Sequence, residues 1–451
     1  MNSIKNIDNF YFIGIGGIGM SALARYFNLE GKKVFGYDKT PSEITSALIE
    51  EGITIQFKDE VSLIPELIQK NKKVLIVCTP AISKKNNILS WLNAKKYCVV
   101  KRSELLGEIS KNSICLAVAG THGKTTTSAI LGHLLASCNM PVTAFLGGVT
   151  ENYNSNLIYK GSEIMVVEAD EFDRSFLYLR PTIACITSMD ADHLDIYGSI
   201  SELENTFVDF SKLVPDSNNL LFKTGLPLEG KTVSATENAD FEARNVRIVK
   251  GSYVFDLKTP SEEIKDLRFH LPGRHNMFNA VTALGMAILV GAPIDSLSKA
   301  LQDFKGVKRR FSYKIKTKNL VLIDDYAHHP KEIDAIHQAV TEMYPQNKKL
   351  IVFQPHLFSR TKDFGTEFAK SLSRFDEVIL LEIYPAREES IEGISSKWLL
   401  DKIGNKNKKI VAKEDLSIEV KNSNCKIKLM VGAGDIGVEV ESITKYLNGE
   451  D

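Results

Sequence analysis

Three short apolar runs in this sequence each lead into a turn that contains glycine, and this feature restricts the possible folds most. The turns cover residues 14–19, 120–123 and 432–437. An apolar strand that enters a glycine turn and then a helix is the opening of a βαβ unit, whose crossover places neighbouring strands in parallel. One such opening for each domain predicts three α/β domains.

The length and the remaining apolar runs support this organisation. A chain of 451 residues exceeds one ordinary domain, and its 43% hydrophobic and 25% charged residues are typical of a globular protein, not of collagen, a coiled coil or a disordered chain. Short β-branched runs that alternate with helical patterns predict buried parallel strands. We expect strands at residues 9–15, 33–36, 73–78, 114–119, 164–167, 183–187, 320–323, 349–353, 377–381 and 426–431.

The domain boundaries that these patterns favour divide the chain into residues 1–109, 110–306 and 307–451. A polar helical stretch ends the first segment, and a basic connector at residues 304–311 introduces the last. Residues 213–271 are less periodic and rich in Asn, Thr and Pro, which predicts an antiparallel or irregular extension of the middle domain.

Charge and cysteine content indicate the compartment and the partners. Lys plus Arg and Asp plus Glu both number 56, so no global field attracts nucleic acid or an anionic membrane. The six cysteines are scattered without metal-like spacing, which indicates reduced packing residues of a cytoplasmic protein.

Residues 10–24 resemble a signal peptide, but their four glycines favour a turn. No other uncharged apolar run approaches the roughly 18 residues of a membrane span.

The first glycine turn has the spacing of a nucleotide diphosphate site. Gly14, Gly16 and Gly19 follow a predicted strand and open a helix, and Asp38 ends the next strand. Glycines allow the backbone to approach a diphosphate, which the helix N-terminus attracts. The same turn also suits NAD, or serves packing alone.

The second glycine turn has the residues of a shortened phosphate-binding loop. Gly123, Lys124 and Thr125 head a helix after the strand at residues 114–119, although strict spacing requires a glycine where Val118 stands. Backbone amides there form an anion nest, the lysine neutralises phosphate oxygens and the threonine hydroxyl can bind Mg²⁺. The alternative is an ordinary helix start.

Carboxylates at neighbouring strand ends are candidates for holding the metal. Glu168 directly follows the strand predicted at residues 164–167 and is the first candidate. Asp190, Asp192 and Asp195 follow the strand at residues 183–187, where a solvated loop or a helix cap is an equally good interpretation. His193 between them favours a metal or phosphate role.

Polar groups also gather in the last part of the chain. Asn276 and Asn279 open a helix, where they suit an adenine edge or a simple helix start. Residues 324–330 and 353–360 each follow a predicted strand, at the edge where α/β sheets bind ligands. His356 and Arg360 together suit a carboxylate, and the His328–His329 pair is a weaker candidate for a transition metal.

Five ordered segments resemble the Mur ligases of peptidoglycan synthesis: residues 120–126, 168–171, 192–195, 273–276 and 324–330. The resemblance implies a Rossmann-like N-terminal domain, a P-loop-type central ATP-binding domain with a mainly parallel sheet, and a Rossmann-like C-terminal domain. Residues 14–21, 353–360 and 383–389 are most similar to members that join L-alanine to UDP-N-acetylmuramate. In such members ATP converts the muramic acid carboxylate to an acyl phosphate, which the amine of alanine attacks, with release of ADP and phosphate.

The resemblance also implies residue roles. The sugar nucleotide is expected at Gly14, Gly16, Gly17, Ile18, Gly19 and Asp38. ATP is expected at Gly120, Thr121, His122, Gly123, Lys124, Thr125, Thr126, Asn276, Asn279, Arg310 and Asp325. Mg²⁺ is expected at Thr125, Glu168 and His193, and the amino acid at Tyr326, His356 and Arg360. The expected catalytic residues are Lys124, Glu168, His193 and Arg310.

Two departures from the family pattern stand out. Several relatives carry a carbamylated lysine shortly after the metal-binding histidine, where this chain has Glu202 and Glu204. Position 357 is often basic in relatives and is leucine here. The alternatives are a ligase of recycled murein tripeptide, an NAD-dependent oxidoreductase and a nucleotide-regulated binding protein. We expect a monomer or weak homodimer that acts on small molecules, without nucleic acid or membrane.

Overall fold

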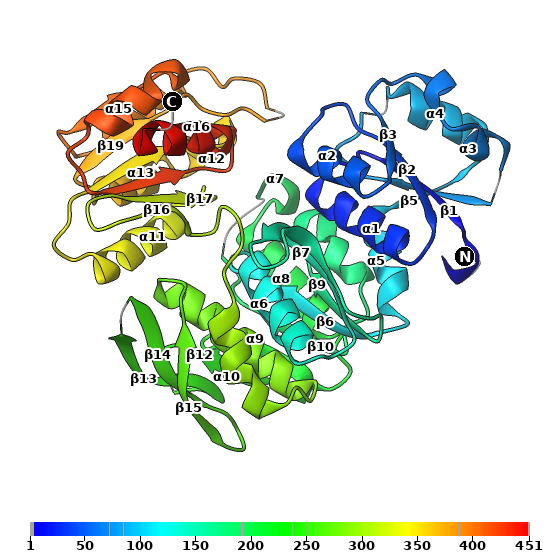
Figure 1. Cartoon of the computed structure of the whole chain (residues 1–451), viewed down its shortest axis with the longest axis horizontal. Coiled ribbons are helices and arrows are strands. Elements are labelled where there is room, and N and C mark those ends of the chain that lie inside the picture. The colour runs from blue at the N-terminus through cyan, green and yellow to red at the C-terminus, as the bar shows by residue number, and fades with distance from the viewer. Residues whose placement is uncertain are drawn as a thin grey trace. The chain divides into compact units, whose positions relative to one another are not determined.

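The computed structural model describes residues 4–71, 73–83, 85–190, 194–236, 238–249, 251–386 and 388–449. These residues form three mainly parallel sheets of five, ten and six strands, with helices between many of the strands (Figure 1). The predicted α/β class is confirmed. Two compact units result: residues 1–247, 254–269 and 278–305 form the first, and residues 248–253, 270–277 and 306–451 form the second.

The N-terminal sheet has the strand order β3-β2-β1-β4-β5, and all its pairs are parallel. Its strands are β1 (Asn9–Ile13), β2 (Lys33–Tyr37), β3 (Thr54–Gln56), β4 (Val74–Cys78) and β5 (Cys98–Lys101). Its helices are α1 (Ile18–Leu29), α2 (Glu43–Glu50), α3 (Glu66–Lys70), α4 (Asn87–Ala94) and α5 (Arg102–Ser110).

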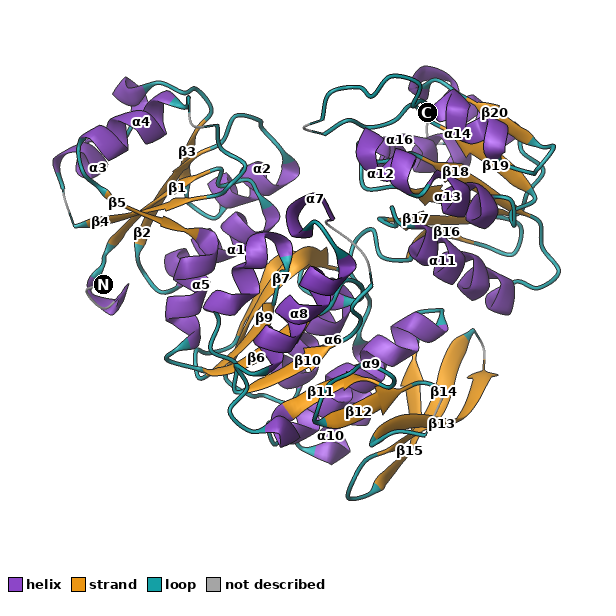
Figure 2. Ribbon diagram, turned by 180° about the vertical axis from the view of Figure 1, so that it is seen from behind, coloured by secondary structure: helices purple, strands orange, loops and turns teal. Residues whose placement is uncertain are grey.

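The alternation of side chains along β1 decides which helices cover which face. Phe10 and Phe12 belong to the core with α1 and α5, whereas Tyr11 and Ile13 pack with α3 and α4. Both faces of the sheet are therefore covered, as a parallel sheet requires, and Figure 2 shows helices on either side of these strands.

The central sheet has the order β15-β14-β13-β12-β11-β10-β6-β9-β7-β8. Its first five strands in the chain are β6 (Ile114–Ala119), β7 (Val142–Thr150), β8 (Ser155–Tyr159), β9 (Ile164–Glu168) and β10 (Ile183–Ile186). The others are β11 (Leu220–Lys223), β12 (Lys231–Ser234), β13 (Phe241–Val249), β14 (Ser252–Lys258) and β15 (Glu263–Phe269). Its helices are α6 (Lys124–Ser137), η3 (Phe172–Tyr178), α7 (Leu194–Tyr197), α8 (Ile200–Ser211), α9 (Arg274–Leu289) and α10 (Ile294–Asp303).

The prediction for residues 213–271 is partly wrong. Strands β11, β12 and β13 continue the central sheet and pair in parallel from β10 onwards. Short strands separated by polar turns gave a weak periodic signal, and the direction of pairing depends on neighbours that are distant in the sequence.

The N-terminal and central sheets share one apolar core within the first compact unit. Side chains from β1 and α1 belong to the same buried cluster as those of β6, β9 and α8. A polar contact crosses this core, because Asn156 of β8 donates to Ser21 Oγ of α1 at 2.9 Å and accepts from Arg25. Arg25 also forms an ion pair with Glu51 at 2.8 Å. The contacts of Asn156 with Ser21 and Arg25 join the first two sheets.

The C-terminal sheet has the order β16-β17-β21-β18-β19-β20, with only β16 antiparallel among its pairs. Its strands are β16 (Ser312–Lys316), β17 (Val321–Asp325), β18 (Lys349–Phe353), β19 (Glu377–Leu380), β20 (Lys408–Ile410) and β21 (Ile427–Val431). Helices α11 (Pro330–Met343), α13 (Gly365–Leu372) and α14 (Ser396–Lys402) cover one face. Helices α15 (Leu416–Asn422) and α16 (Ile436–Asn448) cover the other, and α12 (Phe358–Asp363) follows β18.

All six cysteines are free thiols. Cys115, Cys185 and Cys425 are buried, as predicted for packing residues, whereas Cys98 is exposed on the edge strand β5. In the part of the chain that the structure describes, no helix is long and apolar enough to cross a membrane.

Candidate nucleotide and amino-acid sites

The first glycine turn connects β1 to α1 and is held closed by Asp38. The Gly16 amide donates to Asp38 Oδ2 at 2.8 Å, and a Cβ at Gly16 would lie only 2.9 Å from the same oxygen. Gly17 caps α1 without any side-chain hydrogen bond, and the first turn of α1 has no acidic residue. The amides at this helix N-terminus are therefore available to an anion, while Asp38 stabilises the turn itself.

The second glycine turn connects β6 to α6 and tolerates only glycine at two positions. Gly120 has φ of +124°, and a Cβ there would lie 2.1 Å from Thr187 Oγ1. Gly123 has φ of +81°, and a Cβ would lie 2.5 Å from Asn279 Oδ1. The close approach of Asn279 places one of the predicted adenine-facing residues beside the phosphate-binding loop.

Part of the predicted anion nest is occupied by the protein itself. The amides of Thr121 and His122 donate to Ser188, at 3.2 Å to its carbonyl and 2.9 Å to its hydroxyl. Asp190 also braces this loop, since its amide donates to Thr121 Oγ1 at 3.1 Å and its carboxylate lies 3.6 Å from His122 Nε2. The groups left for phosphate are the first amides of α6 and the side chain of Lys124.

Lys124 is held over the loop by two acceptors. Its Nζ donates to the Gly120 carbonyl at 2.7 Å and lies within 2.9 Å of both carboxylate oxygens of Glu171, whose side chain is 1% exposed. Burial alone would lower the pKa of Lys124, but the charges of Glu171, Asp170 and Glu168 outweigh burial and raise it. The ammonium therefore stays protonated at neutral pH.

Glu171 is not identifiable from the sequence as the partner of Lys124. The only signal was its place in the acidic run 168–171, and the run itself does not tell which acid faces the lysine. The structure selects Glu171 because the chain turns after β9 into η3, and Tyr197 donates to the Glu171 carbonyl at 2.5 Å.

Glu168 and Thr125 form the described part of the candidate metal site. Thr125 Oγ1 donates to both Glu168 oxygens at 3.0 Å, and the Gly147 amide donates to Oε2 at 2.9 Å. A carboxylate and a hydroxyl are oxygen ligands of the kind that Mg²⁺ prefers, so these two residues fit that ion. Within the described residues no three His, Cys, Asp or Glu side chains gather as a metal site.

The other residues predicted to hold metal after β10 are only partly described. Asp192 and His193 lie outside the described residues, as does the side chain of Asp195. Glu202 stands in the first turn of α8 and pairs with Arg174 at 3.5 Å.

In the second compact unit, Asp325 organises the end of β17. Its carboxylate accepts the amides of Phe311 at 2.7 Å and Ala327 at 2.8 Å. Burial raises its pKa to about 6, against the opposing effect of Arg310. The guanidinium of Arg310 lies 5.1 Å from the Tyr326 ring centre, so three predicted site residues stand together here.

The predicted amino-acid residues His356 and Arg360 are neighbours. Arg360 Nη1 lies 3.3 Å from His356 Nδ1, and the His356 ring lies 5.9 Å from that of His328, which in turn is 5.5 Å from Tyr326. Leu357 between them has φ of +73°, a strained conformation for leucine. Strain of this kind is typical of functional loops.

The His328–His329 pair is not arranged as a metal site in the described contacts. His328 Nδ1 lies 3.0 Å from the Tyr326 carbonyl. His329 caps α11, because its Nδ1 accepts the Lys331 amide at 3.3 Å. The transition-metal interpretation of this pair therefore has no support from the geometry.

His275, at the start of α9, provides a pH prediction. Burial lowers its pKa to about 4, and Arg310 acts in the same direction, while Glu332 and Glu342 oppose. In the unfolded chain the pKa of this histidine is near 6.5. Between pH 6.5 and pH 4 the unfolded chain therefore binds a proton at His275 that the folded chain does not bind. We expect stability to fall by up to about 3 kcal/mol between pH 7 and pH 4 because of this residue. His275→Gln should flatten the pH dependence of the melting temperature, and an unchanged slope would contradict this.

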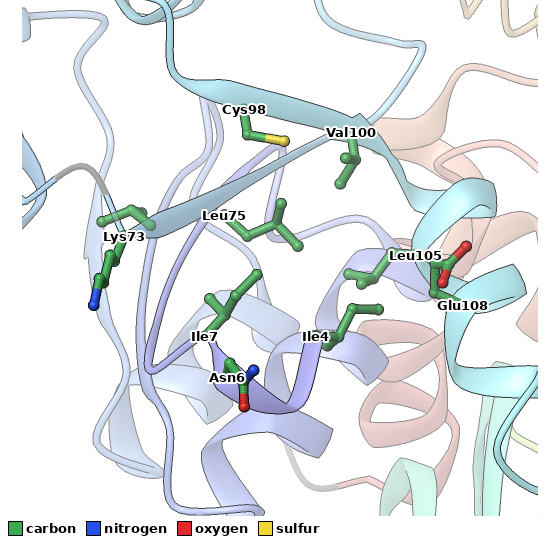
Figure 3. A pocket seen from close by; sticks show the side chains of 10 residues that line it. Ile4, Asn6, Ile7, Lys73, Leu75, Cys98, Val100, Leu105 and Glu108 are labelled. Carbon is green, nitrogen blue, oxygen red and sulfur yellow. The ribbon is translucent and has the colours of Figure 1, made fainter. Parts of the chain in front are cut away.

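A separate cleft of about 500 Å³ lies on the N-terminal sheet (Figure 3). It is lined mostly by apolar side chains from η1 (Ile4–Asn6), β4, β5 and α5, including Leu75, Val100 and Leu105. None of the predicted site residues lines it. Its apolar character does not suit a diphosphate.

The fold and these loops define a nucleotide-binding α/β protein of the phosphate-loop type, in which a lysine, a threonine and a carboxylate face the head of one helix. The chain belongs to the Mur ligase family. Models described as Mur ligase family catalytic domain, Mur ligase middle domain and Mur ligase glutamate ligase domain match residues 9–113, 118–287 and 309–433.

Individual relatives cover nearly the whole chain. The UDP-N-acetylmuramate–L-alanine ligase of Christiangramia forsetii is 59% identical over 448 residues, 99% of each chain. That of Parabacteroides distasonis is 45% identical over 98% of each. The crystal structure of UDP-N-acetylmuramate–alanine ligase from Thermotoga maritima superimposes with a TM-score of 0.84 at 26% identity, covering 98% of this chain and all of that one. A murein peptide ligase from Psychrobacter arcticus shares the fold, with a TM-score of 0.70 and 18% identity.

Proposed function

We propose that this protein joins L-alanine to the lactyl carboxylate of UDP-N-acetylmuramate at the expense of ATP, in the cytoplasm, as a step of peptidoglycan synthesis. The observation that carries the proposal is the 59% identity over 99% of the chain to a ligase of that name. The paired Lys124 and the Thr125–Glu168 contact supply the groups that such a reaction needs.

The proposed reaction has two displacements. The sugar carboxylate attacks the γ-phosphorus of ATP and ADP leaves. The amine of alanine then attacks the acyl carbon, and phosphate leaves. Lys124, with the first amides of α6, holds phosphate oxygens and offsets their charge as the first displacement proceeds. Bound Mg²⁺, held by Thr125 and Glu168, would neutralise phosphate charge.

The second compact unit supplies the amino-acid groups in this proposal. Arg360 offers a guanidinium fork, which matches the carboxylate of alanine, and His356 Nδ1 lies 3.3 Å from its Nη1. Arg310 and Asp325 stand beside Tyr326, where we assign them to the nucleotide.

The alternatives explain fewer of these contacts. An NAD-dependent oxidoreductase has no use for the Lys124–Glu171 pair or for Glu168 against Thr125. A ligase of murein tripeptide uses the same nucleotide groups, but the 59% and 45% identical relatives both carry the alanine ligase name.

The test is phosphate release by the purified chain with each substrate omitted in turn. We expect release only when ATP, UDP-N-acetylmuramate, L-alanine and Mg²⁺ are all present. Serine, glycine and murein tripeptide replace alanine in parallel reactions. Release with tripeptide and not with alanine would overturn the proposal in favour of the recycling reaction, and NAD binding without any release would favour the oxidoreductase.

A further inference from the structure

Arg102 lies at the same sheet edge as the first glycine turn. The register of β1, β4 and β5 places Ile13 level with Cys78, and Cys78 level with Lys101. Gly14 directly follows β1 and Arg102 directly follows β5. Both residues therefore lie at the carboxyl ends of the strands, where parallel sheets bind ligands.

The side chain of Arg102 reaches the start of α1. A Cβ at Gly19 would lie 2.5 Å from Arg102 Nη1 and 3.1 Å from its Cδ, so the guanidinium packs directly against the first turn of this helix. Glycine at position 19 is what allows this approach. A side chain of any other type would displace the arginine.

The position is electrostatically unusual. A helix N-terminus carries a positive partial charge, so a cation beside it is unfavourable unless an anion joins them. Asp170 provides one partner at 3.2 Å, but it lies beside the metal-binding Glu168 and not on the glycine turn. The first turn of α1 contributes no acid.

Most donor groups of Arg102 remain available. A guanidinium has five N–H donors, and among the hydrogen bonds of the described residues Arg102 makes one, from Nη2 to Asp170. Its side chain is 25% exposed. Several N–H groups can therefore reach a ligand without breaking the contact to Asp170.

We propose that Arg102 is a further residue of the sugar-nucleotide site and binds the diphosphate at the N-terminus of α1. This assignment rests on the proposed function. Arg102 adds a side-chain cation to the backbone amides at the N-terminus of α1, and through Asp170 it connects that site to the segment that directly follows Glu168 at the end of β9.

The test is the affinity of the full chain for UDP, measured by calorimetry. Arg102→Ala should weaken UDP binding about 10- to 100-fold, as expected for loss of charge-assisted hydrogen bonds, and UMP binding less. Arg102→Lys should restore part of the loss, because it keeps the charge without the planar fork. Lys101→Ala is the matched control: it removes the adjacent exposed cation, which pairs with Asp173, and should leave UDP affinity unchanged.

The variant Asp170→Asn distinguishes direct binding of UDP by Arg102 from a structural role of the Arg102–Asp170 ion pair. It removes the ion pair but keeps the guanidinium, so UDP affinity should persist. An equal loss in Asp170→Asn and Arg102→Ala, or no loss in Arg102→Ala, would overturn the assignment. So would a loss confined to UDP-N-acetylmuramate with UDP binding intact, since the guanidinium would then serve the carboxylate. If the unaltered chain neither bound UDP nor released phosphate, the proposed function itself would fail, and this assignment with it.

Discussion

Replacing Lys124 with methionine is expected to lower the rate of phosphate release by about 10³-fold, because one preorganised cation at developing phosphate charge contributes on this scale. The Lys124 ammonium is held in place by the Gly120 carbonyl at 2.7 Å and by Glu171. Methionine keeps most of the side-chain length but supplies no charge. The measurement is single-turnover phosphate release at saturating substrates.

The partner Glu171 requires a control, because a buried carboxylate that loses its cation destabilises a protein by about 3–5 kcal/mol. The double variant Lys124→Met with Glu171→Gln removes both charges and should recover much of the melting temperature lost in the single variant. Its phosphate release should remain low. Recovery of release together with stability would contradict a direct role of the lysine at phosphate.

Replacing Glu168 with glutamine is expected to raise the Mg²⁺ concentration for half-maximal release at least about tenfold and to lower the maximal rate by about 10²-fold. The carboxylate accepts Thr125 Oγ1 at 3.0 Å and the Gly147 amide at 2.9 Å. Glutamine keeps the shape but is neutral and turns one acceptor into a donor, which weakens the hold on a divalent cation. The measurement is a Mg²⁺ titration of phosphate release.

Glu163→Gln is the matched control for Glu168. Glu163 is exposed and directly precedes β9, the strand that ends at Glu168, so the same substitution there should leave the titration unchanged. A Glu168→Gln variant with the Mg²⁺ dependence of the unaltered chain would remove Glu168 from the metal site.

Much of the fold was predictable because its strands are fully buried. All ten predicted strands are present, with ends that differ by at most two residues, since uniform apolar runs bounded by Gly, Asp or Pro report burial on both faces. Some of the strands that were missed, such as β3 and β20, are short and stand at sheet edges, where one side of the strand has no neighbour and the apolar signal is weak, whereas others, such as β7, lie inside the central sheet. The three-domain division of residues stays a prediction.

By itself, the sequence determined the two units of strand, glycine turn and helix at residues 9–29 and 114–137, while the assignment of Gly120, Gly123, Lys124 and Asp38 to phosphates stays a prediction. Only the tertiary structure decided that Glu171 pairs with Lys124 and that Arg102 lies against Gly19. It also decided that the amides of Thr121 and His122 donate to Ser188. The physical reason is the distance along the chain between the residues in contact. Spacing along the chain reports local geometry within a strand, turn or helix, whereas these contacts join residues 47, 83 and about 67 positions apart and depend on which strands the sheets place side by side.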